Sequence, residues 1–554
     1  MSDLLDRLDE LDSELVDTDA GWTAVHRRVQ RGRTARRGLA GLAAVALVAT
    51  GVLAAGQLDD QESTQVTTEP VPPPGAIELE PGWNQLPELP IAPRINPAIT
   101  ELDDGDLFVW GGFTPGSTGL QLFDGAVLDA ESGEWDVLPP APEIVPNEAD
   151  AIWTGGQVVV MPSSGTEPFV PLVYDIDADT WTTGAAGPDD CSNAGLTWTG
   201  EEAIVVCGLA TRDVSPVNLA AYDPAADRWR ALPDPPIAYA DGDLVWADDV
   251  LVAFGRTEDL AFPAGDGAAV TYDPSTDRWA EPFRVPVNAQ ATSITWTGEE
   301  IVVVDYSMDA GAFDPATGEV RELPPVPLRF YECYPEAATA GTTAVAALCS
   351  GSAALGPDDA WAPFLGPNPP GSQSFTGPDS IIGAVGGEHA LYTAAFGLPD
   401  EPSGPDTAGS TTNIWAYVPP DAVDGGLGIE SPIPLGVTTF SPPDGAAISS
   451  VELVSGGANE TVEASVELAD GATCIARSGY VGLVDEDGVA DGDERVEIAT
   501  ADGWTGSAAV GRSTPGAVTV AWYWNADLGT DRQEATCPTL EQAVELARGF
   551  DSPA

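Results

Sequence analysis

Short apolar runs separated by tight turns recur along most of the chain. Three copies share one pattern, a β-branched strand, a Trp-Thr-Gly turn and a second apolar strand, at residues 151–160, 196–206 and 294–304. Weaker copies lie around Gly105, Asp248, Gly341 and Gly386. The turns follow one another at intervals of about 43 to 50 residues, which is the period of a four-stranded propeller blade. The pattern therefore predicts an all-β fold in which each repeat supplies one small sheet.

A second marker follows each of these hairpins. It is a strand ending in Tyr-Asp, a turn of Pro, Asp or Gly, and a strand starting with Trp, which is a hairpin signal. Copies lie at 129–135, 174–181, 222–229 and 272–279, and degenerate ones at 313–320 and around Trp361 and Trp415. Leu-Pro elements follow at Leu138, Leu232 and Leu323. Proline is unsuited to a strand interior, so these elements are expected to cross from one blade to the next.

These markers resemble the kelch and galactose-oxidase type of β-propeller, in which a Tyr-Asp…Trp element followed by Leu-Pro closes each blade. The resemblance covers residues 77–420. The double glycine of that family survives clearly only as Gly111-Gly112, so the chain resembles a divergent member. The resemblance implies four antiparallel strands per blade around a channel, closed by a terminal strand for which residues 76–86 are the candidate. We expect seven blades, with six or eight as the alternatives.

Residues 38–56 form an uncharged apolar run preceded by an arginine-rich flank. As a helix this run would span roughly 28 Å, close to the thickness of a bilayer. The positive-inside rule then predicts a single-pass cell-membrane protein with residues 1–37 as a cytoplasmic, amphipathic and basic segment. Residues 57–76 read as a Pro-rich stalk that leads to an extracytoplasmic bulk. A cleaved signal peptide ending near Ala54-Ala55-Gly56 is the alternative. The layout is similar to that of single-pass actinobacterial membrane proteins of the anti-sigma type, although the metal-binding motif of that family is absent.

The charge is strongly one-sided, with 88 acidic residues against 21 basic ones and a formal net charge of −67. Such a surface repels phosphate backbones, so we expect no nucleic-acid partner. We interpret the acidity as an adaptation for solubility in a saline medium, where salt screens the repulsion between like charges. A surface for a cationic partner or for calcium is the alternative.

All six cysteines follow the apolar run, which fits an exported, oxidised domain. Cys191 and Cys207 bracket one strand-turn-strand repeat, and Cys333 and Cys349 bracket another at the same spacing. We therefore predict two local disulfides, which leaves a third between Cys474 and Cys537. Zinc binding by these cysteines is the competing reading.

Residues 421–445 are rich in Gly, Pro and Asp and are expected to be a linker. Residues 446–554 are predicted to form a small α+β domain. Its strands are expected at 448–453, 461–468, 472–481, 495–500 and 518–524. A final helix should begin at a capping box of Thr539 and Gln542, bury Leu540, Val544 and Ala547 and stop at Gly549.

The sequence shows no convincing catalytic, cofactor or metal constellation. His26 and His389 are the two histidines, and His389 is predicted to be a surface residue in the turn of the seventh blade. The acidic run 485–494 has the oxygen density of a calcium loop without its spacing, so calcium is the one cofactor considered. Trp153, Trp198, Trp246 and Trp296 recur at equivalent positions and are predicted to be packing residues.

These observations lead to a functional hypothesis. We expect a membrane-tethered, extracytoplasmic binding protein, a sensor or scaffold, whose propeller recognises a protein or glycan. The chain is more easily read as a binding protein than as an enzyme. The alternative is a carbohydrate-active enzyme that uses paired carboxylates at the mouth of the propeller channel.

Overall fold

The computed structural model describes residues 76–550 with internal gaps. The gaps are residues 115–119, 143–148, 163–168, 189–192, 208–217, 238–243, 257–265, 290–291, 329–334, 349–350, 366–384, 398–410, 421, 424–425, 428, 430–432, 436–437, 456–460, 481–494, 501–504, 512–515 and 527–528. The predicted cytoplasmic segment, the predicted membrane span and almost all of the predicted stalk lie outside the described residues. No helix within the described ranges is long and apolar enough to cross a membrane.

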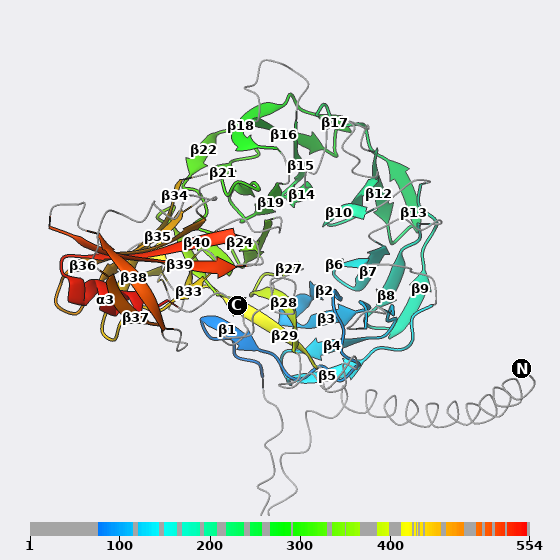
Figure 1. Ribbon diagram of the computed structural model, residues 1–554. Coiled ribbons are helices and arrows are strands. Elements are labelled where there is room, and N and C mark those ends of the chain that lie inside the picture. The colour runs from blue at the N-terminus through cyan, green and yellow to red at the C-terminus, as the bar shows by residue number, and fades with distance from the viewer. Residues whose placement is uncertain are drawn as a thin grey trace, which may run out of the picture. The chain divides into compact units, whose positions relative to one another are not determined.

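In the described part of the chain, seven antiparallel sheets follow one another around a ring and form a β-propeller (Figure 1). Blade 1 consists of β2 (Ala98–Glu101), β3 (Leu107–Trp110), β4 (Gly125–Asp129) and β5 (Glu134–Val137). Blade 2 consists of β6 (Ala149–Trp153), β7 (Gln157–Pro162), β8 (Leu172–Asp175) and β9 (Thr180–Thr183). Blade 3 consists of β10 (Asn193–Trp198), β11 (Ala203–Cys207), β12 (Asn218–Asp223) and β13 (Arg228–Ala231).

The next three blades repeat this arrangement. Blade 4 consists of β14 (Leu244–Ala247), β15 (Val250–Gly255), β16 (Asp266–Asp273) and β17 (Arg278–Trp279), with β18 (Phe283–Asn288) also paired to β16. Blade 5 consists of β19 (Ser293–Trp296), β20 (Ile301–Val304), β21 (Ala310–Phe313) and β22 (Val320–Leu323). Blade 6 consists of β23 (Glu336–Ala340), β24 (Thr343–Leu348), β25 (Gly351–Leu355) and β26 (Trp361–Phe364).

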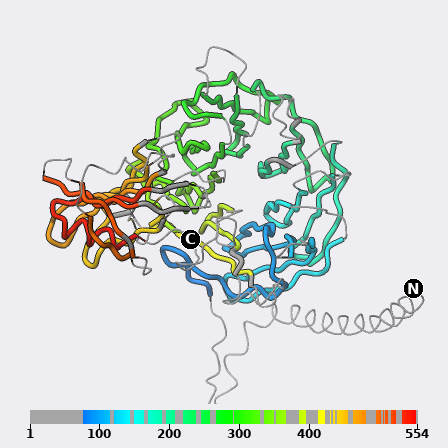
Figure 2. Tube along the Cα trace, in the orientation of Figure 1, coloured from blue at the N-terminus to red at the C-terminus, as the bar shows by residue number. Residues whose placement is uncertain are grey.

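Blade 7 joins the two ends of the ring. Its strands β27 (Val385–Gly386), β28 (Leu391–Gly397) and β29 (Thr411–Val418) come from the end of the repeats, and β1 (Gly82–Gln85) supplies the fourth strand. Trp83 of β1 lies opposite Tyr417 of β29, and Figure 2 shows the two segments side by side. The predictions of seven blades and of closure by a strand within residues 76–86 are confirmed.

The second strand of each blade is buried on both sides, which explains its continuous apolar sequence. Val158 and Val160 of β7 pack with Phe108 and Trp110 of β3, so the core runs from one blade into the next. The recurring tryptophans of the first strands are partly buried against such clusters, as predicted, with Trp153 as one example. The propeller is thus held together by apolar contacts between blades.

The Tyr-Asp…Trp marker has a defined structural role. The tyrosine hydroxyl donates to the aspartate five residues later, at 2.8 Å for Tyr174 and Asp179. This aspartate has a positive φ of 54°, a conformation that Asp tolerates better than most residues do. The marker therefore fixes the turn between the third and fourth strands.

The tryptophan that starts the fourth strand binds the preceding blade. Its indole N–H donates to a backbone carbonyl just after the fourth strand of that blade. The pairs are Trp83–Leu365, Trp135–Pro87, Trp181–Pro139, Trp229–Ala185, Trp279–Pro233 and Trp361–Pro324, at 2.7 to 2.9 Å. Four of the acceptors are prolines of a Leu-Pro element. These elements cross between blades, as predicted, and also supply the acceptor.

The C-terminal residues form a seven-stranded antiparallel sheet with one helix. In spatial order its strands are β34 (Ala447–Ser455), β35 (Thr461–Glu467), β36 (Thr473–Tyr480), β40 (Gly529–Cys537), β39 (Val518–Ala526), β38 (Thr505–Gly511) and β37 (Arg495–Ala499). The helix α3 (Leu540–Ala547) buries Ala543, Leu546 and Ala547 against the sheet. The predicted strands are present, and β38 and β40 are two strands that the sequence analysis missed.

One local prediction for this region is confirmed and two need adjustment. The capping box of Thr539 and Gln542 is present, with Leu540 and Val544 partly buried. Gly549 is required for a different reason than the predicted helix stop, because a Cβ there would lie 2.0 Å from the carbonyl oxygen of Ser441. The predicted linker contains the hairpin β32 (Ile433–Leu435) and β33 (Thr438–Phe440), whose apolar side chains join the core of the sheet. It also contains the short pair β30 (Ala422–Val423) and β31 (Gly426–Leu427).

Candidate functional site

The two faces of the propeller differ in their connections. On one face, which we call the turn face, short turns join the first and second strands of each blade and the third and fourth strands of blades 1 to 6, such as the turn from Asp175 to Thr180. On the other face, the second and third strands of blades 1 to 4 and of blade 7 are joined by longer segments, such as 111–124 in blade 1, whereas blades 5 and 6 have the shorter links 305–309 and 349–350. We call this the connection face. Binding residues in folded proteins are concentrated on loops held by a rigid scaffold, so the connection face is the candidate binding surface.

Arg94 organises the connection face where blade 7 meets blade 1. Its guanidinium is fully buried and donates to the carbonyl oxygens of Gly111 at 2.8 Å and Asp124 at 3.0 Å, and to the Asp124 carboxylate. Its backbone N–H donates to the Thr412 hydroxyl at 2.6 Å. Burial lowers the pKa of Arg94, and the Asp124 carboxylate opposes this effect. These bonds fix the bases of two connections, and Leu120 of one of them is 65% exposed.

Asp305 holds another part of this face. Its carboxylate is buried and accepts backbone N–H groups from Ser307 at 2.7 Å, Asp309 at 3.0 Å and Asn288 at 3.1 Å. Burial, with a smaller effect of the Asp309 charge, raises the pKa of Asp305 to about 6. Burial also raises the pKa of Asp309. The carboxylate therefore ties the β20–β21 connection to the end of β18.

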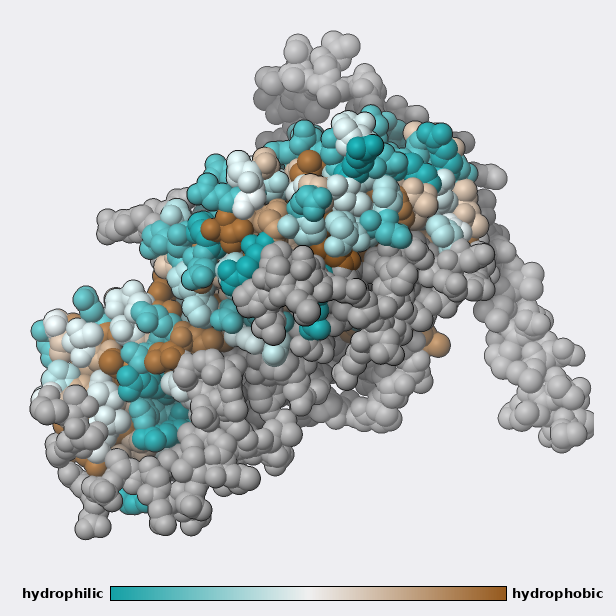
Figure 3. All heavy atoms as spheres, turned by 90° about the horizontal axis from the view of Figure 1, so that it is seen from above, coloured by the Kyte–Doolittle hydropathy of each residue, from teal (hydrophilic) through white to brown (hydrophobic). Residues whose placement is uncertain are grey.

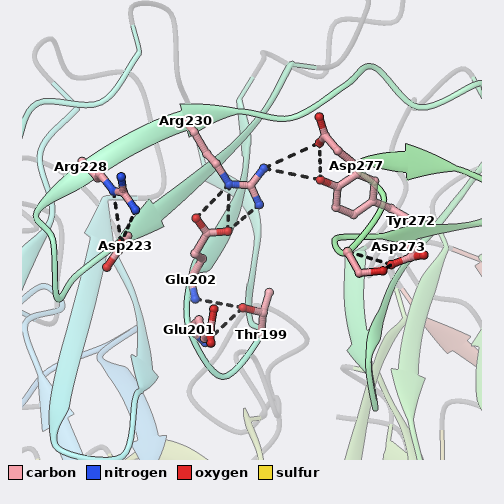
Figure 4. Close-up of polar contacts among 10 residues, drawn as sticks. Thr199, Glu201, Glu202, Asp223, Arg228, Arg230, Tyr272, Asp273 and Asp277 are labelled. Carbon is pink, nitrogen blue, oxygen red and sulfur yellow. Dashed lines mark hydrogen bonds and ion pairs between the residues drawn. The ribbon is translucent and has the colours of Figure 1, made fainter.

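On the turn face, Arg230 bridges blades 3 and 4 (Figure 4). It donates to Glu202, in the turn of its own blade, from Nε at 2.9 Å and from Nη2 at 2.5 Å. It also reaches Tyr272 at 3.5 Å and Asp277 at 4.0 Å in the next blade. The hydrogen bond to Glu202 raises the pKa of Arg230. The group spans the seam between two blades, and sequence reasoning did not single it out.

Blades 5 and 6 carry a second copy of this bridge. Arg321 binds Glu300 in its own blade and Asp359 in the next blade, each at 2.5 Å. The two arginines occupy the same position in the fourth strand, one residue after Trp229 in blade 3 and one after Val320 in blade 5. The repetition identifies these groups as structural connectors between blades.

His389 is not an isolated surface residue, although it is half-exposed and lies in the turn of blade 7, as predicted. Its Nδ1 lies 2.6 Å from the carboxylate of Glu101, at the end of β2 in blade 1. The Tyr392 hydroxyl donates to the same oxygen at 3.1 Å. Burial, and next the Glu101 charge, raise the pKa of Tyr392, which therefore stays a donor. Glu101 was not predicted, because it lies 288 residues away in sequence.

Gly387 makes this arrangement possible. A Cβ at this position would lie 2.0 Å from a carboxylate oxygen of Glu101. The Gly387 carbonyl also accepts the N–H of Gly341 from blade 6 at 3.0 Å. Three blades thus meet at this turn. The histidine, glutamate and tyrosine therefore form a polar contact between blades 7 and 1.

The cysteine predictions can be followed in part. Cys474 and Cys537 form the predicted disulfide, with Cα atoms 4.5 Å apart on the neighbouring strands β36 and β40. Cys191, Cys333 and Cys349 lie outside the described residues. The backbone of Cys207 lies in β11 opposite Asn193, and the structure does not describe its side chain. The two local disulfides stay predictions.

Metal binding has no support in the described residues, among which no group of three or more His, Cys, Asp or Glu side chains is arranged to hold an ion. The acidic run 485–494 and His26 lie outside the described residues. In the view of Figure 3 the described surface is mostly hydrophilic with small hydrophobic patches, as the acidic composition predicts.

The fold defines the class of the protein as a seven-bladed β-propeller followed by a C-terminal sheet, with a surface suited to binding. No protein-family model matches the chain, and no curated protein sequence matches it. The resemblance to the kelch and galactose-oxidase type therefore rests on the repeat markers alone.

Proposed function

We propose that this protein is a membrane-tethered, extracytoplasmic binding protein, a sensor or scaffold, whose propeller recognises a protein or glycan through its connection face. The observation that carries the proposal is the asymmetry of the ring, with short turns on one face and longer connections on the other in blades 1 to 4 and in blade 7. Arg94 and Asp305 fix the bases of these connections, so a partner would meet segments held by a rigid frame.

Tethering and export are supported by sequence features. The uncharged run 38–56 follows a cluster of arginines, and all cysteines follow the run. A disulfide between Cys474 and Cys537 fits an oxidising compartment. In the sensor version of the proposal, residues 1–37 relay binding to the cytoplasm, so their deletion should abolish a transcriptional response and leave the extracytoplasmic part folded.

The proposal can be tested by comparing two altered forms of residues 77–554. In the first, residues 115–119, 211–217 and 257–264 are replaced by Gly-Ser segments of equal length. In the second, the exposed turn-face residues Glu131, Glu201 and Glu299 are replaced by alanine. We expect the natural protein and the second form to retain a partner from a cell-envelope extract, and the first form to lose it. Retention by all three forms would contradict the assignment to the connection face.

A carbohydrate-active enzyme is the alternative, and one observation favours it. Asp305 and Asp309 lie on the connection face, and both carboxyl groups have a raised pKa, as a catalytic acid requires. The Asp305 oxygens, however, accept three backbone N–H groups, which assigns this side chain to holding the connection. Glycosidase activity that disappears in Asp309→Asn would support the alternative over the binding function.

A further inference from the structure

The C-terminal sheet carries a cavity on the face opposite helix α3. Along β36, Cys474, Ala476 and Ser478 are buried on the helix side, whereas Thr473, Ile475 and Arg477 alternate with them and line the cavity. The cavity has a volume of about 490 Å³, within the range of pockets for small ligands. It is independent of the propeller surface proposed above.

Small residues explain why the sheet is hollow here. The floor over β38 and β39 consists of Ala509, Gly511 and Ala521, with Gly516 and Ala517 beside it. Larger side chains at these outward positions would fill the space above the strands. Ala509 and Ala521 are only 5% and 7% exposed, so this part of the sheet is sheltered although the helix lies on its other face.

A row of alternating charges borders the cavity. Glu463, Arg477 and Glu534 lie directly opposite one another on the adjacent strands β35, β36 and β40. Nε of Arg477 donates to Glu463 at 2.6 Å, and Nη1 of Arg477 lies 3.7 Å from Glu534. Arg532, two residues before Glu534 on β40, also forms an ion pair with it. The two guanidinium groups and the two carboxylates neutralise one another, so the border offers fixed donors and acceptors without a net charge.

Several polar groups at the cavity can still accept a ligand. Nε of Arg532 is buried and has no hydrogen-bond partner among the described residues, and a buried donor left unpaired is costly. The hydroxyls of Thr519 and Thr536 bond each other at 2.9 Å, which leaves acceptor positions on both oxygens. Thr473 adds a third hydroxyl to the lining.

The chemistry of this border favours an uncharged, hydroxylated ligand. An anion would gain little from arginines already paired with carboxylates, and the net charge of −67 repels it. A saccharide hydroxyl both donates and accepts, so it can bind a carboxylate and a guanidinium of the row together. Its C–H surface would lie against the small residues of the floor. We propose that this cavity is a binding site for a neutral saccharide of one or two sugar units.

Saturation-transfer NMR on the full chain tests the proposal. The probes are glucose, galactose, mannose, N-acetylglucosamine and their β-linked disaccharides, with acetate and inorganic phosphate as anionic comparisons. We expect at least one sugar to bind, and both anions to give no signal. Ala521→Leu, which fills the floor, and Arg532→Gln, which removes the unpaired donor, should each weaken sugar binding at least tenfold.

Arg548→Gln provides the matched control, because Arg548 is an exposed arginine that pairs with Glu545 at the end of α3. It should bind the sugar as the natural protein does. Circular dichroism of each variant checks that the sheet is folded, and Thr519→Val gives a second variant that keeps the charges. The proposal fails if no sugar of the set binds, if Ala521→Leu and Thr519→Val bind normally, or if the anions bind instead.

Discussion

The indole N–H of Trp83 donates to the carbonyl oxygen of Leu365 at 2.7 Å, across 282 residues of sequence. Trp83 lies in β1, the strand that completes blade 7, and Leu365 follows the last strand of blade 6. The bond repeats the contact that other blades make with neighbours adjacent in sequence. At this position it joins the beginning of the propeller to its end, so it contributes to closing the ring.

Trp83→Phe should destabilise the propeller by roughly 1 kcal/mol, because the aromatic packing is kept and one buried hydrogen bond is lost. Chemical unfolding of residues 77–554, followed by tryptophan fluorescence, measures the change. Trp135→Phe removes the equivalent bond to Pro87 between blades 7 and 1 and serves as the comparison. Because Trp83 also packs against Phe364 and Tyr417, Trp83→Ala should cost distinctly more than Trp83→Phe. Equal stability of Trp83→Ala and the natural protein would contradict closure by β1.

Arg230→Gln should lower the free energy of unfolding by about 1 to 2 kcal/mol, because it leaves the partly buried Glu202 without its cation. Arg228 is the matched control on the same strand. It is mostly exposed, and among the described residues its ion pair is with Asp223 of its own turn, so Arg228→Gln should change the stability by less than about 0.5 kcal/mol. Equal effects of the two substitutions would contradict a stabilising role of Arg230.

Glu101→Gln should destabilise the junction of blades 7 and 1 by about 1 to 2 kcal/mol, since Tyr392 and His389 lose their charged acceptor. Glu388→Gln, at the exposed neighbour of His389, should have little effect. In residues 77–554, His389 is the one histidine, so its ¹⁵N signals are assigned without ambiguity. Because a carboxylate only accepts, we expect Nδ1 to carry a hydrogen in the natural protein. An unprotonated Nδ1 would contradict the contact with Glu101.

Asp305 predicts a pH dependence of stability. Its pKa is raised to about 6 in the folded protein, so its protonated form is favoured by folding. The corresponding stabilisation is fully present below about pH 4 and is lost as the pH rises through 6. Each pKa unit is worth about 1.4 kcal/mol, and the pKa of Asp305 rises from 3.8 to about 6 on folding, so the stabilisation that is lost is about 3 kcal/mol at most.

Asp305→Asn removes this titration. The free energy of unfolding, measured between pH 4 and pH 7, should therefore fall less steeply with rising pH in Asp305→Asn than in the natural protein. Asp314→Asn is the comparison. Hydrogen bonds within its exposed turn lower the pKa of Asp314, so the titration of Asp314 changes the stability with pH in the direction opposite to that of Asp305. Identical pH profiles for the natural protein and Asp305→Asn would refute the assignment.

The repeats could be predicted from the sequence because each blade encodes the same local events. A glycine or aspartate of positive φ turns the first hairpin of blades 1 to 6, as at Gly200, Asp248 and Gly298, and the Tyr-Asp…Trp marker turns the second hairpin of blades 2 to 4. Strand β40 was missed because its sequence GTDRQEATC is polar on one face, while the other face mixes Asp531 and Gln533 with small residues and shows no apolar alternation. Its burial depends on α3 and the neighbouring strands, and the sequence pattern does not contain these contacts.

The polar sites were harder to predict because their partners are distant in sequence. Glu101 and His389 become neighbours only when the ring closes. Arg477 and Glu534 meet only because β40 inserts between β36 and β39 in the C-terminal sheet. By contrast, Cys474 and Cys537 could be paired by elimination once the local cysteine spacing had been noted.

The central claim, that a partner is bound on the connection face, is tested most directly by site-specific photo-crosslinking in the cells that make the protein. A photoreactive amino acid is placed at Leu120, exposed on the connection face, or at Glu299, exposed on the turn face. We predict that Leu120 gives a discrete cross-linked product and that Glu299 gives none. Capture from Glu299 alone, or equal capture from both positions, would contradict the claim.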